Sequence, residues 1–226
     1  MKKLLKFIFC IILVAICVLG YLGYEKYSKA IKDMPLEEKV LEIRSADNYT
    51  EFSNIPDTFI DAVVAVEDRR FYKHNGIDFY GILRAVVTDI KERELAQGGS
   101  TITQQLAKNM YFPMDNSPVR KIAEMIMAVK LEREYKKEEI LELYCNVIYY
   151  GKGCYNIHDA AIKYFKKEPI DMTDYEATLL AGIPNAPSVY SVDDELSKKR
   201  QDKVLKSMLR SGYISEKEME KILKDR

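Results

Sequence analysis

Two stretches of the sequence decide how the chain is interpreted: EDRRFYKHNG at residues 67–76 and GGSTITQQLAKN at residues 98–109. The first stretch follows an apolar run, and its closing Asn-Gly pair is a common end for a helix. The second stretch has two glycines that permit a tight loop, followed by hydroxyl residues that can cap a helix. Together they predict a carboxylate and an anion-binding helix facing one cleft.

The first predicted helix runs from about residue 56 to residue 76. On it, Glu67, Arg70, Phe71 and His74 are spaced at i, i+3, i+4 and i+7, and such residues share one face of a helix. A carboxylate placed against apolar neighbours could act as a general base. An ordinary i, i+3 salt bridge between Glu67 and Arg70 at the end of a core helix is the alternative interpretation.

The second predicted helix begins after Ser100 or Thr101, and Thr101 with Gln104 matches the capping-box pattern. Thr101, Gln105 and Lys108 fall on one helix face, so hydroxyl, amide and ammonium donors line up beside a positive helix terminus. Such a terminus suits a phosphate or pyrophosphate. A capped helix end with no ligand is the plain structural alternative.

A further cationic group follows at Arg120, Lys121 and Glu124, with Arg120 and Glu124 one helical turn apart. An i, i+4 ion pair explains this spacing on structural grounds alone. Combined with the two stretches above, the group predicts a site with two carboxylates and a cationic clamp. Transfer of a sugar from a polyprenyl pyrophosphate to a sugar hydroxyl needs these parts, because charge accumulates on the leaving pyrophosphate.

The 226 residues can form one membrane anchor and one globular domain. Lys plus Arg and Asp plus Glu are both 35, and this balance gives no reason to expect a nucleic-acid partner. The pattern predicts a mainly α domain, with further helices at about residues 79–94, 101–111, 118–133, 137–149, 156–166, 173–182, 194–210 and 215–224. At most one short strand is expected, from Val40 to Arg44. The predicted organisation is an anchor at 1–24, a connector at 25–50 and the domain at 51–226.

An apolar stretch from Phe7 to Tyr24 is long enough to cross a bilayer. Lys2, Lys3 and Lys6 precede it, so the N-terminus is expected to be cytoplasmic and the rest of the chain extracytoplasmic in a single-pass bacterial cell-membrane protein. A cleaved signal peptide is the competing interpretation. We favour an uncleaved anchor because no small-x-small cleavage site closes the apolar run.

The cysteines predict neither a disulfide framework nor a metal site. Cys10 and Cys17 lie in the anchor, whereas Cys145 and Cys154 lie on the exported side, where a disulfide is chemically permitted. Free thiols are expected for this second pair. Together with His158 the two cysteines match no usual zinc spacing, so no metal ligands are assigned.

Five ordered motifs resemble those of the peptidoglycan glycosyltransferases, family 51 of the glycosyltransferases. Besides the three groups above, they are KEEILELYCNVIYYG at residues 137–151 and LLAGIPNAPSVY at residues 179–190, with AAIKYF at residues 160–165 between them. The resemblance covers roughly residues 52–210. The fourth and fifth motifs are interpreted as mainly structural.

The resemblance implies a lysozyme-like helical head, a small membrane-apposed jaw at about residues 77–97, and polymerisation of lipid II into glycan strands. It implies that Glu67 is the catalytic base and Glu124 the second essential carboxylate. The substrate-binding residues that it implies are Asp68, Phe71, His74, Arg84, Ser100, Thr101, Gln104, Gln105, Lys108, Asn109, Arg120 and Lys121.

The same resemblance implies no organic cofactor, with Mg or Mn as an optional divalent cation at the donor pyrophosphate. The implied partners are lipid II, the lipid-linked glycan strand, the bilayer and other cell-wall synthesis proteins. The chain has no Ser-x-x-Lys and no Lys-Thr-Gly, so a monofunctional enzyme without a transpeptidase is expected.

The chain departs from the family pattern at two positions. Asn116 stands where the family usually has an arginine, which predicts a pyrophosphate clamp with one charge fewer. Asn156 stands where the family commonly has glycine, which concerns only the local backbone.

Two other functions are kept as alternatives. A lytic transglycosylase or lysozyme-like hydrolase would share the fold and one acidic catalyst, but it has no need for a pyrophosphate clamp. An inactive membrane-anchored scaffold would be expected to lack Glu67 or Glu124, and the sequence has both.

Overall fold

The computed structural model describes residues 2–83, 99–112, 117–192 and 194–225. The α-helices are α1 (Lys2–Asp33), α2 (Leu36–Arg44), α3 (Asp57–Glu67), α5 (Ile102–Tyr111), α6 (Pro118–Glu134), α7 (Lys137–Val147), α8 (Ile157–Phe165), α9 (Asp174–Gly182), α10 (Glu195–Ser211) and α11 (Glu216–Lys224). Short 3-10 helices are η1 (Phe52–Asn54), η2 (Phe71–Lys73), η3 (Pro169–Asp171) and η4 (Ile183–Asn185). These described ranges contain no strand, which confirms the mainly α prediction.

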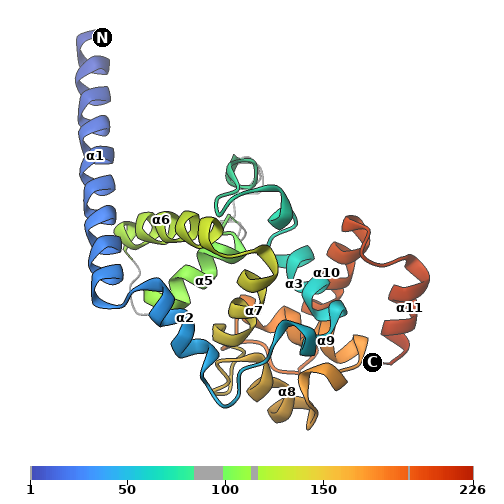
Figure 1. Ribbon diagram of the computed structural model, residues 1–226. Helices are drawn as coiled ribbons and strands as arrows, with labels where there is room; N and C mark the ends of the chain where they lie inside the picture. Colours follow the sequence, from blue (N-terminus) through green and yellow to red (C-terminus); the bar gives the residue numbers. More distant parts are fainter. Residues whose placement is uncertain (1, 84–98, 113–116, 193, 226) are drawn as a thin grey trace.

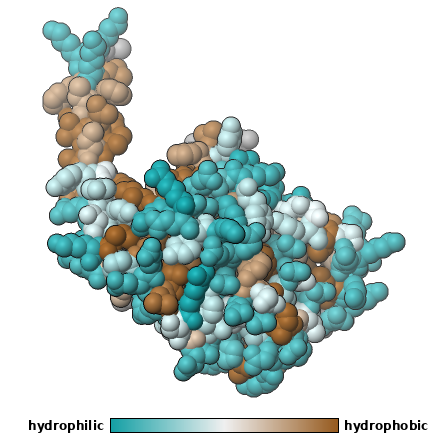
Figure 2. Space-filling view, in the orientation of Figure 1, coloured by the Kyte–Doolittle hydropathy of each residue, from teal (hydrophilic) through white to brown (hydrophobic). Residues whose placement is uncertain are grey.

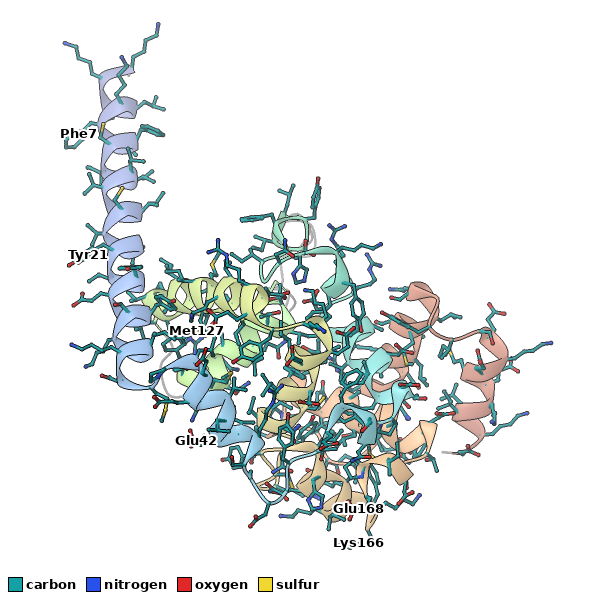
Figure 3. All side chains as sticks on the ribbon, in the orientation of Figure 1. Phe7, Tyr21, Glu42, Met127, Lys166 and Glu168 are labelled. Atoms are coloured by element: carbon teal, nitrogen blue, oxygen red, sulfur yellow. The ribbon has the colours of Figure 1, made fainter. Side chains whose placement is uncertain are left out.

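Helix α1 projects from the rest of the molecule as a single long rod (Figure 1). Its projecting part is apolar over most of its length, with a hydrophilic tip (Figure 2), and Phe7 and Tyr21 lie on it away from the other helices (Figure 3). By length and composition this helix can cross a membrane. It extends to Asp33, well past the predicted end of the anchor at Tyr24.

The base of α1 packs closely on α6 at Gly23, the buried residue of α1. A Cβ atom at this position would lie 2.4 Å from Ile122 Cγ2 and 3.4 Å from the Val119 carbonyl oxygen. Carbon atoms cannot approach as closely as 2.4 Å without displacement, so glycine permits this helix contact. The projecting helix is therefore joined to α6 through a tightly packed contact.

The strand expected from Val40 to Arg44 is wrong, because these residues form the end of α2. Leu36 and Val40 are spaced at i, i+4, and both are buried where α2 packs on α7. Val40 and Ile43 favour a strand by local preference, but burial of one helical face outweighs that preference.

The core of the domain forms around α3, which contacts α9 and α10, and around α5, which contacts α6 and α7. The apolar residues Phe59, Ile60, Val63 and Val64 of α3 are buried in this core. Met127 of α6 is buried as well, and Figure 3 shows it where α6 lies over the other helices. Buried apolar contacts between the helices therefore hold the site residues in fixed relative positions.

Helix α3 ends at Glu67, so the prediction that it continues to residue 76 is wrong. Asp68 leaves the helical conformation, with φ −152° and ψ 73°, and the chain continues through η2. Glu67, Arg70, Phe71 and His74 consequently do not form one helical stripe. Arg70 instead pairs with Asp78 at 3.2 Å, which removes the predicted i, i+3 salt bridge with Glu67.

Most of the predicted jaw at residues 77–97, and of the helix predicted at 79–94, lies outside the described residues. A helix begins at Phe79 and is described as far as Leu83. Phe79, Tyr80 and Leu83 are exposed large apolar residues.

Two smaller expectations are settled by local geometry. The four cysteines are free, which agrees with the prediction for Cys145 and Cys154. Asn156 has an extended backbone with φ −154° and caps α8, because its side chain accepts a hydrogen bond from the Asp159 N–H at 2.7 Å. A glycine is not required at this position, and asparagine is a favoured N-cap residue.

Candidate active site

A polar cavity of ≈ 560 Å³ lies among α3, α5, α6, η4 and α10. Its lining residues are Val66, Glu67, Ser100, Gln104, Gln105, Lys108, Arg120, Lys121, Glu124, Pro184, Asn185 and Arg200. Two carboxylates and four cationic side chains thus surround one space.

Glu67 stands at the last position of α3, and its carboxylate receives one donor on each oxygen. Gln105 Nε2 donates to Oε2 at 2.9 Å, and Arg200 Nη2 donates to Oε1 at 3.1 Å. The Glu67 side chain is 11% exposed, so these contacts are only partly screened by water. A carboxylate oxygen accepts hydrogen bonds, so these two donors fix the orientation of the Glu67 side chain at the cavity.

Arg200 was missed by the sequence interpretation, although it contacts the predicted base directly. It lies on α10, and its Nε also donates to the Gly182 carbonyl oxygen at 3.4 Å. The available signal was periodicity: Ser197 and Val204 are buried, and Arg200 lies three residues after the first and four before the second. A cation on the inward face of an otherwise charged helix marks it as a site candidate.

The second carboxylate, Glu124, is 2% exposed and lies between two cations of its own helix. Its Oε1 is 2.8 Å from Arg120 Nε, and its Oε2 is 3.1 Å from Lys121 Nζ. Lys121 Nζ also donates to Ser100 Oγ at 2.8 Å. The i, i+4 ion pair is therefore present, and its members line the cavity.

Lys108 provides a further positive group on the wall formed by α5. Burial lowers the pKa of Lys108 from its ordinary value; Glu124 and Glu67 oppose this shift, whereas Arg120 and Lys121 reinforce it. Among the described residues its ammonium group has no hydrogen-bond or ion-pair partner. A partly desolvated ammonium beside other cations favours an anionic ligand, because the ligand would supply the missing partner.

The N-terminus of α5 does not serve as the predicted pyrophosphate site. The Ile102 N–H donates to Asp68 Oδ2 at 3.1 Å, so a carboxylate of the chain already occupies the helix end. Thr101 caps the helix by accepting from the Gln104 N–H, and its hydroxyl donates to the Gly76 carbonyl oxygen at 2.7 Å. The capping box is confirmed, but Thr101 does not share the cavity wall with Gln105 and Lys108.

The remaining predicted substrate-binding residues support the site rather than line the cavity. His74 Nε2 lies 2.9 Å from Asp68 Oδ2, and both side chains are buried. Phe71 is fully buried beneath Lys137, whose Nζ lies 4.2 Å from the ring centroid. The Asn109 amide donates to the Gln105 carbonyl oxygen at 2.9 Å.

The predicted residues therefore fall into three groups. Those that line the cavity are Glu67, Ser100, Gln104, Gln105, Lys108, Arg120, Lys121 and Glu124. Those outside the lining are Asp68, Phe71, His74, Thr101 and Asn109. Arg84 and Asn116 lie outside the described residues.

The fourth and fifth motifs also reach this site, although they were expected to be mainly structural. Pro184 and Asn185 of η4 line the cavity. The Tyr144 hydroxyl of α7 lies 3.4 Å from Gln105 Oε1. Both motifs thus contribute residues to the cavity or to its wall.

The cavity combines two kinds of chemical group. Glu67 can accept a proton from a bound hydroxyl. Lys108, Arg120 and Lys121 can stabilise negative charge that develops on a leaving group. This arrangement suits the transfer of a group from a phosphate ester or pyrophosphate to a hydroxyl nucleophile.

Comparisons with known proteins give consistent results. A family model described as Transglycosylase matches residues 36–209. Penicillin-binding protein 1F of Bacillus subtilis is 40% identical, with 96% of this chain and 33% of the relative aligned. Penicillin-binding protein 1A of Aquifex aeolicus is 43% identical over 76% of this chain and 24% of the relative.

A shorter relative has a similar level of identity. A Cupriavidus necator protein named "Putative transglycosylase" is 40% identical, over 82% of this chain and 81% of its own length. In contrast, the chain spans between about a fifth and a third of the penicillin-binding proteins that it matches.

Proposed function

The chain belongs to the transglycosylase family, and on that premise we propose that it is a peptidoglycan glycosyltransferase that joins lipid II units into β-1,4-linked glycan strands. The observation that carries this proposal is the placement of Glu67 on the same cavity as Lys108, Arg120 and Lys121. A proton acceptor and a cationic wall are both required when a sugar leaves a pyrophosphate.

Glu67 is the proposed general base. It removes the proton from the 4-hydroxyl of the acceptor N-acetylglucosamine while that oxygen forms a bond to the anomeric carbon of the donor. The bond between this carbon and the pyrophosphate oxygen breaks in the same displacement, so the anomeric configuration inverts. Gln105 and Arg200 support this role, because their hydrogen bonds orient the carboxylate of Glu67 at the cavity.

The cationic wall is the proposed site of the leaving undecaprenyl pyrophosphate. Lys108 has no partner among the described residues, and Lys121 is 40% exposed, so both can turn donors toward a phosphate. Glu124 lies between Arg120 and Lys121 and keeps their charged groups together. Its proposed role is therefore to position the cations that stabilise the leaving group.

The donor set of the cavity does not fit a resident divalent metal ion. Each oxygen of Glu124 faces a cation, and each oxygen of Glu67 accepts from a donor side chain. Mg²⁺ prefers several oxygen ligands, whereas four cationic side chains line this space. We therefore propose that the cationic side chains, and not a metal ion, stabilise the negative charge on the leaving pyrophosphate.

The membrane anchor supports a lipid-linked substrate. Helix α1 is long and apolar enough to cross a bilayer, and Lys2, Lys3 and Lys6 precede its apolar part. By the positive-inside tendency we propose a cytoplasmic N-terminus and an extracytoplasmic catalytic domain. Partners in cell-wall synthesis and the absence of a transpeptidase remain predictions.

A lysozyme-like hydrolase and an inactive scaffold are disfavoured by the same observation. A hydrolase that cuts finished glycan meets no pyrophosphate, so its site does not require three cations beside the second carboxylate. A scaffold does not require two donors that orient Glu67 at a cavity.

The test incubates the full-length protein in detergent micelles with labelled lipid II. We expect β-1,4-linked strands and one undecaprenyl pyrophosphate for each bond formed. Lack of polymer with well-folded protein would contradict the proposal. Parallel incubation with finished, uncrosslinked glycan separates the alternatives, because a hydrolase would shorten these strands and release no pyrophosphate.

A further inference from the structure

We propose that Tyr144 is a positioning residue for the base: its hydroxyl fixes the carboxamide of Gln105 so that the amide nitrogen faces Glu67. This inference rests on the proposed function, since it concerns how the proton acceptor of that reaction is prepared. Tyr144 lies on α7, outside the segments that carry the carboxylates and cations of the cavity.

The amide of a glutamine side chain can take two orientations that have almost the same shape. A carboxamide has a donor end and an acceptor end of similar size, and rotation by half a turn exchanges them. Gln105 presents Nε2 to Glu67 Oε2 at 2.9 Å. In the reversed orientation two acceptor oxygens would face each other at this distance, which repels the carboxylate and removes one of its two donors.

The oxygen end of the Gln105 amide contacts Tyr144. The Tyr144 hydroxyl lies 3.4 Å from Gln105 Oε1 and donates to it. Tyr144 is fully buried, and burial raises its pKa well above the ordinary value, with the negative charge of Glu67 acting in the same direction. The hydroxyl therefore keeps its proton and remains available as a donor.

Removal of that donor is unfavourable. With phenylalanine at residue 144, the side-chain oxygen Oε1 of Gln105 would lose the hydroxyl that faces it. A partly buried acceptor that loses its partner costs free energy, so the amide would rotate toward the cavity, where water can reach it. Rotation would withdraw Nε2 from Glu67. The base would then keep Arg200 on its other oxygen and lose the alignment that Gln105 provides.

The effect of the Gln105 amide on Glu67 can be separated from the effect of the charged groups around this carboxylate. The groups that face it are Arg200 from α10, Gln105 and Lys108 from α5, and Tyr144 from α7. The substitution Tyr144→Phe leaves both cations unchanged and removes one oxygen atom. The substitution therefore tests the orientation of the Gln105 amide while the charged groups around Glu67 stay the same.

The chain offers a matched control in Tyr150. It is also fully buried, and its hydroxyl donates to the Cys145 carbonyl oxygen at 3.4 Å instead of to a site residue. Tyr150→Phe therefore removes the same atom from the same kind of environment. It should leave kcat and KM at wild-type values.

The experiment measures kcat and KM for lipid II polymerisation with the full-length wild type, Tyr144→Phe, Gln105→Ala, the double variant and Tyr150→Phe. We expect Tyr144→Phe to lower kcat roughly tenfold with little change in KM. In the Gln105→Ala background the tyrosine substitution should have no further effect. A wild-type kcat for Tyr144→Phe, or a full additional loss in that background, would overturn the inference.

A second readout does not depend on turnover. A water-soluble carbodiimide modifies carboxyl groups, and peptide mass mapping reports how fast Glu67 is modified. The rate should rise in Tyr144→Phe, because Glu67 Oε2 loses its donor, and stay at the wild-type value in Tyr150→Phe; equal rates in the two variants would overturn the inference. An inactive wild type would count against the proposed function, while the labelling rates would still decide the role of Tyr144.

Discussion

Arg200 Nη2 lies 3.1 Å from Glu67 Oε1, although the two residues are 133 positions apart in the sequence. Their side chains are 12% and 11% exposed, so the pair is largely shielded from solvent. Helix α10 thus supplies a cation to the carboxylate at the end of α3. This contact makes the last long helix of the domain part of the candidate active site.

We expect Arg200→Gln to lower kcat by about 10- to 100-fold, because Glu67 loses its charged partner and one of its two orienting donors. Stability should fall by about 1–3 kcal/mol. Arg210→Gln, at an exposed position of the same helix, is the control. Equal kinetics for the two variants would refute a role for Arg200.

Lys108 gives a prediction for the alkaline range. Burial lowers the pKa of its ammonium, so its charge is lost at a lower pH than that of a free lysine. Binding of undecaprenyl pyrophosphate should therefore weaken as the pH rises through this lowered value. In Lys108→Arg the charge persists, because arginine titrates only above about 12, so this weakening should shift to higher pH. The test measures undecaprenyl pyrophosphate binding by the wild type and by Lys108→Arg from neutral to alkaline pH. The same pH dependence in both proteins would contradict the assignment of Lys108 to the pyrophosphate site.

Glu124→Gln should disturb the cationic wall more than the base. Glu124 is nearly inaccessible and interacts with Arg120 and Lys121, so the substitution leaves two neighbouring cations without their shared carboxylate. We expect a loss of about 1–3 kcal/mol in unfolding free energy and weaker positioning of the pyrophosphate. Glu134→Gln on the same helix, which removes an exposed pair with Lys130, should change neither quantity. Thermal unfolding and donor-binding measurements decide between these outcomes.

Many helices and much of the cavity follow from local sequence signals. The helices predicted at 101–111, 118–133 and 173–182 agree with α5, α6 and α9 within about two residues, because capping residues and apolar periodicity agree there. Glu67, Lys108 and Glu124 were selected from motifs and do line one cavity. Their roles in catalysis remain predictions.

The sequence-based predictions that are wrong fail because contacts between distant segments override the local sequence signals. Helix α3 stops early because Asp68 is held by His74 and by the first N–H of α5, and neither contact is visible in local periodicity. The strand predicted at 40–44 is helical because its apolar residues pack against α7. Arg200 carries no motif that distinguishes it from the other cations of its helix. Its contact with Glu67 depends on how α10 packs against α3.

The contact between α1 and α6 can be tested at two glycines of one helix. Gly23→Leu forces a side chain into Ile122 and should cost about 1–3 kcal/mol and lower activity, because α6 carries Glu124 and the cationic wall. Gly20→Leu is the control, since a Cβ there meets no atom within 4 Å. Both proteins are compared by thermal unfolding and lipid II turnover in the same detergent. Equal losses would show that the position of α1 on α6 does not matter.

The central claim is that Glu67 removes the acceptor proton, and Glu67→Gln tests it most directly. The amide keeps the size of the side chain but cannot act as the base. The measurement is the rate of lipid II polymerisation by this variant, alongside its affinity for undecaprenyl pyrophosphate. We predict a loss of at least about 100-fold in kcat with donor binding retained. Polymerisation at the wild-type rate would contradict the claim.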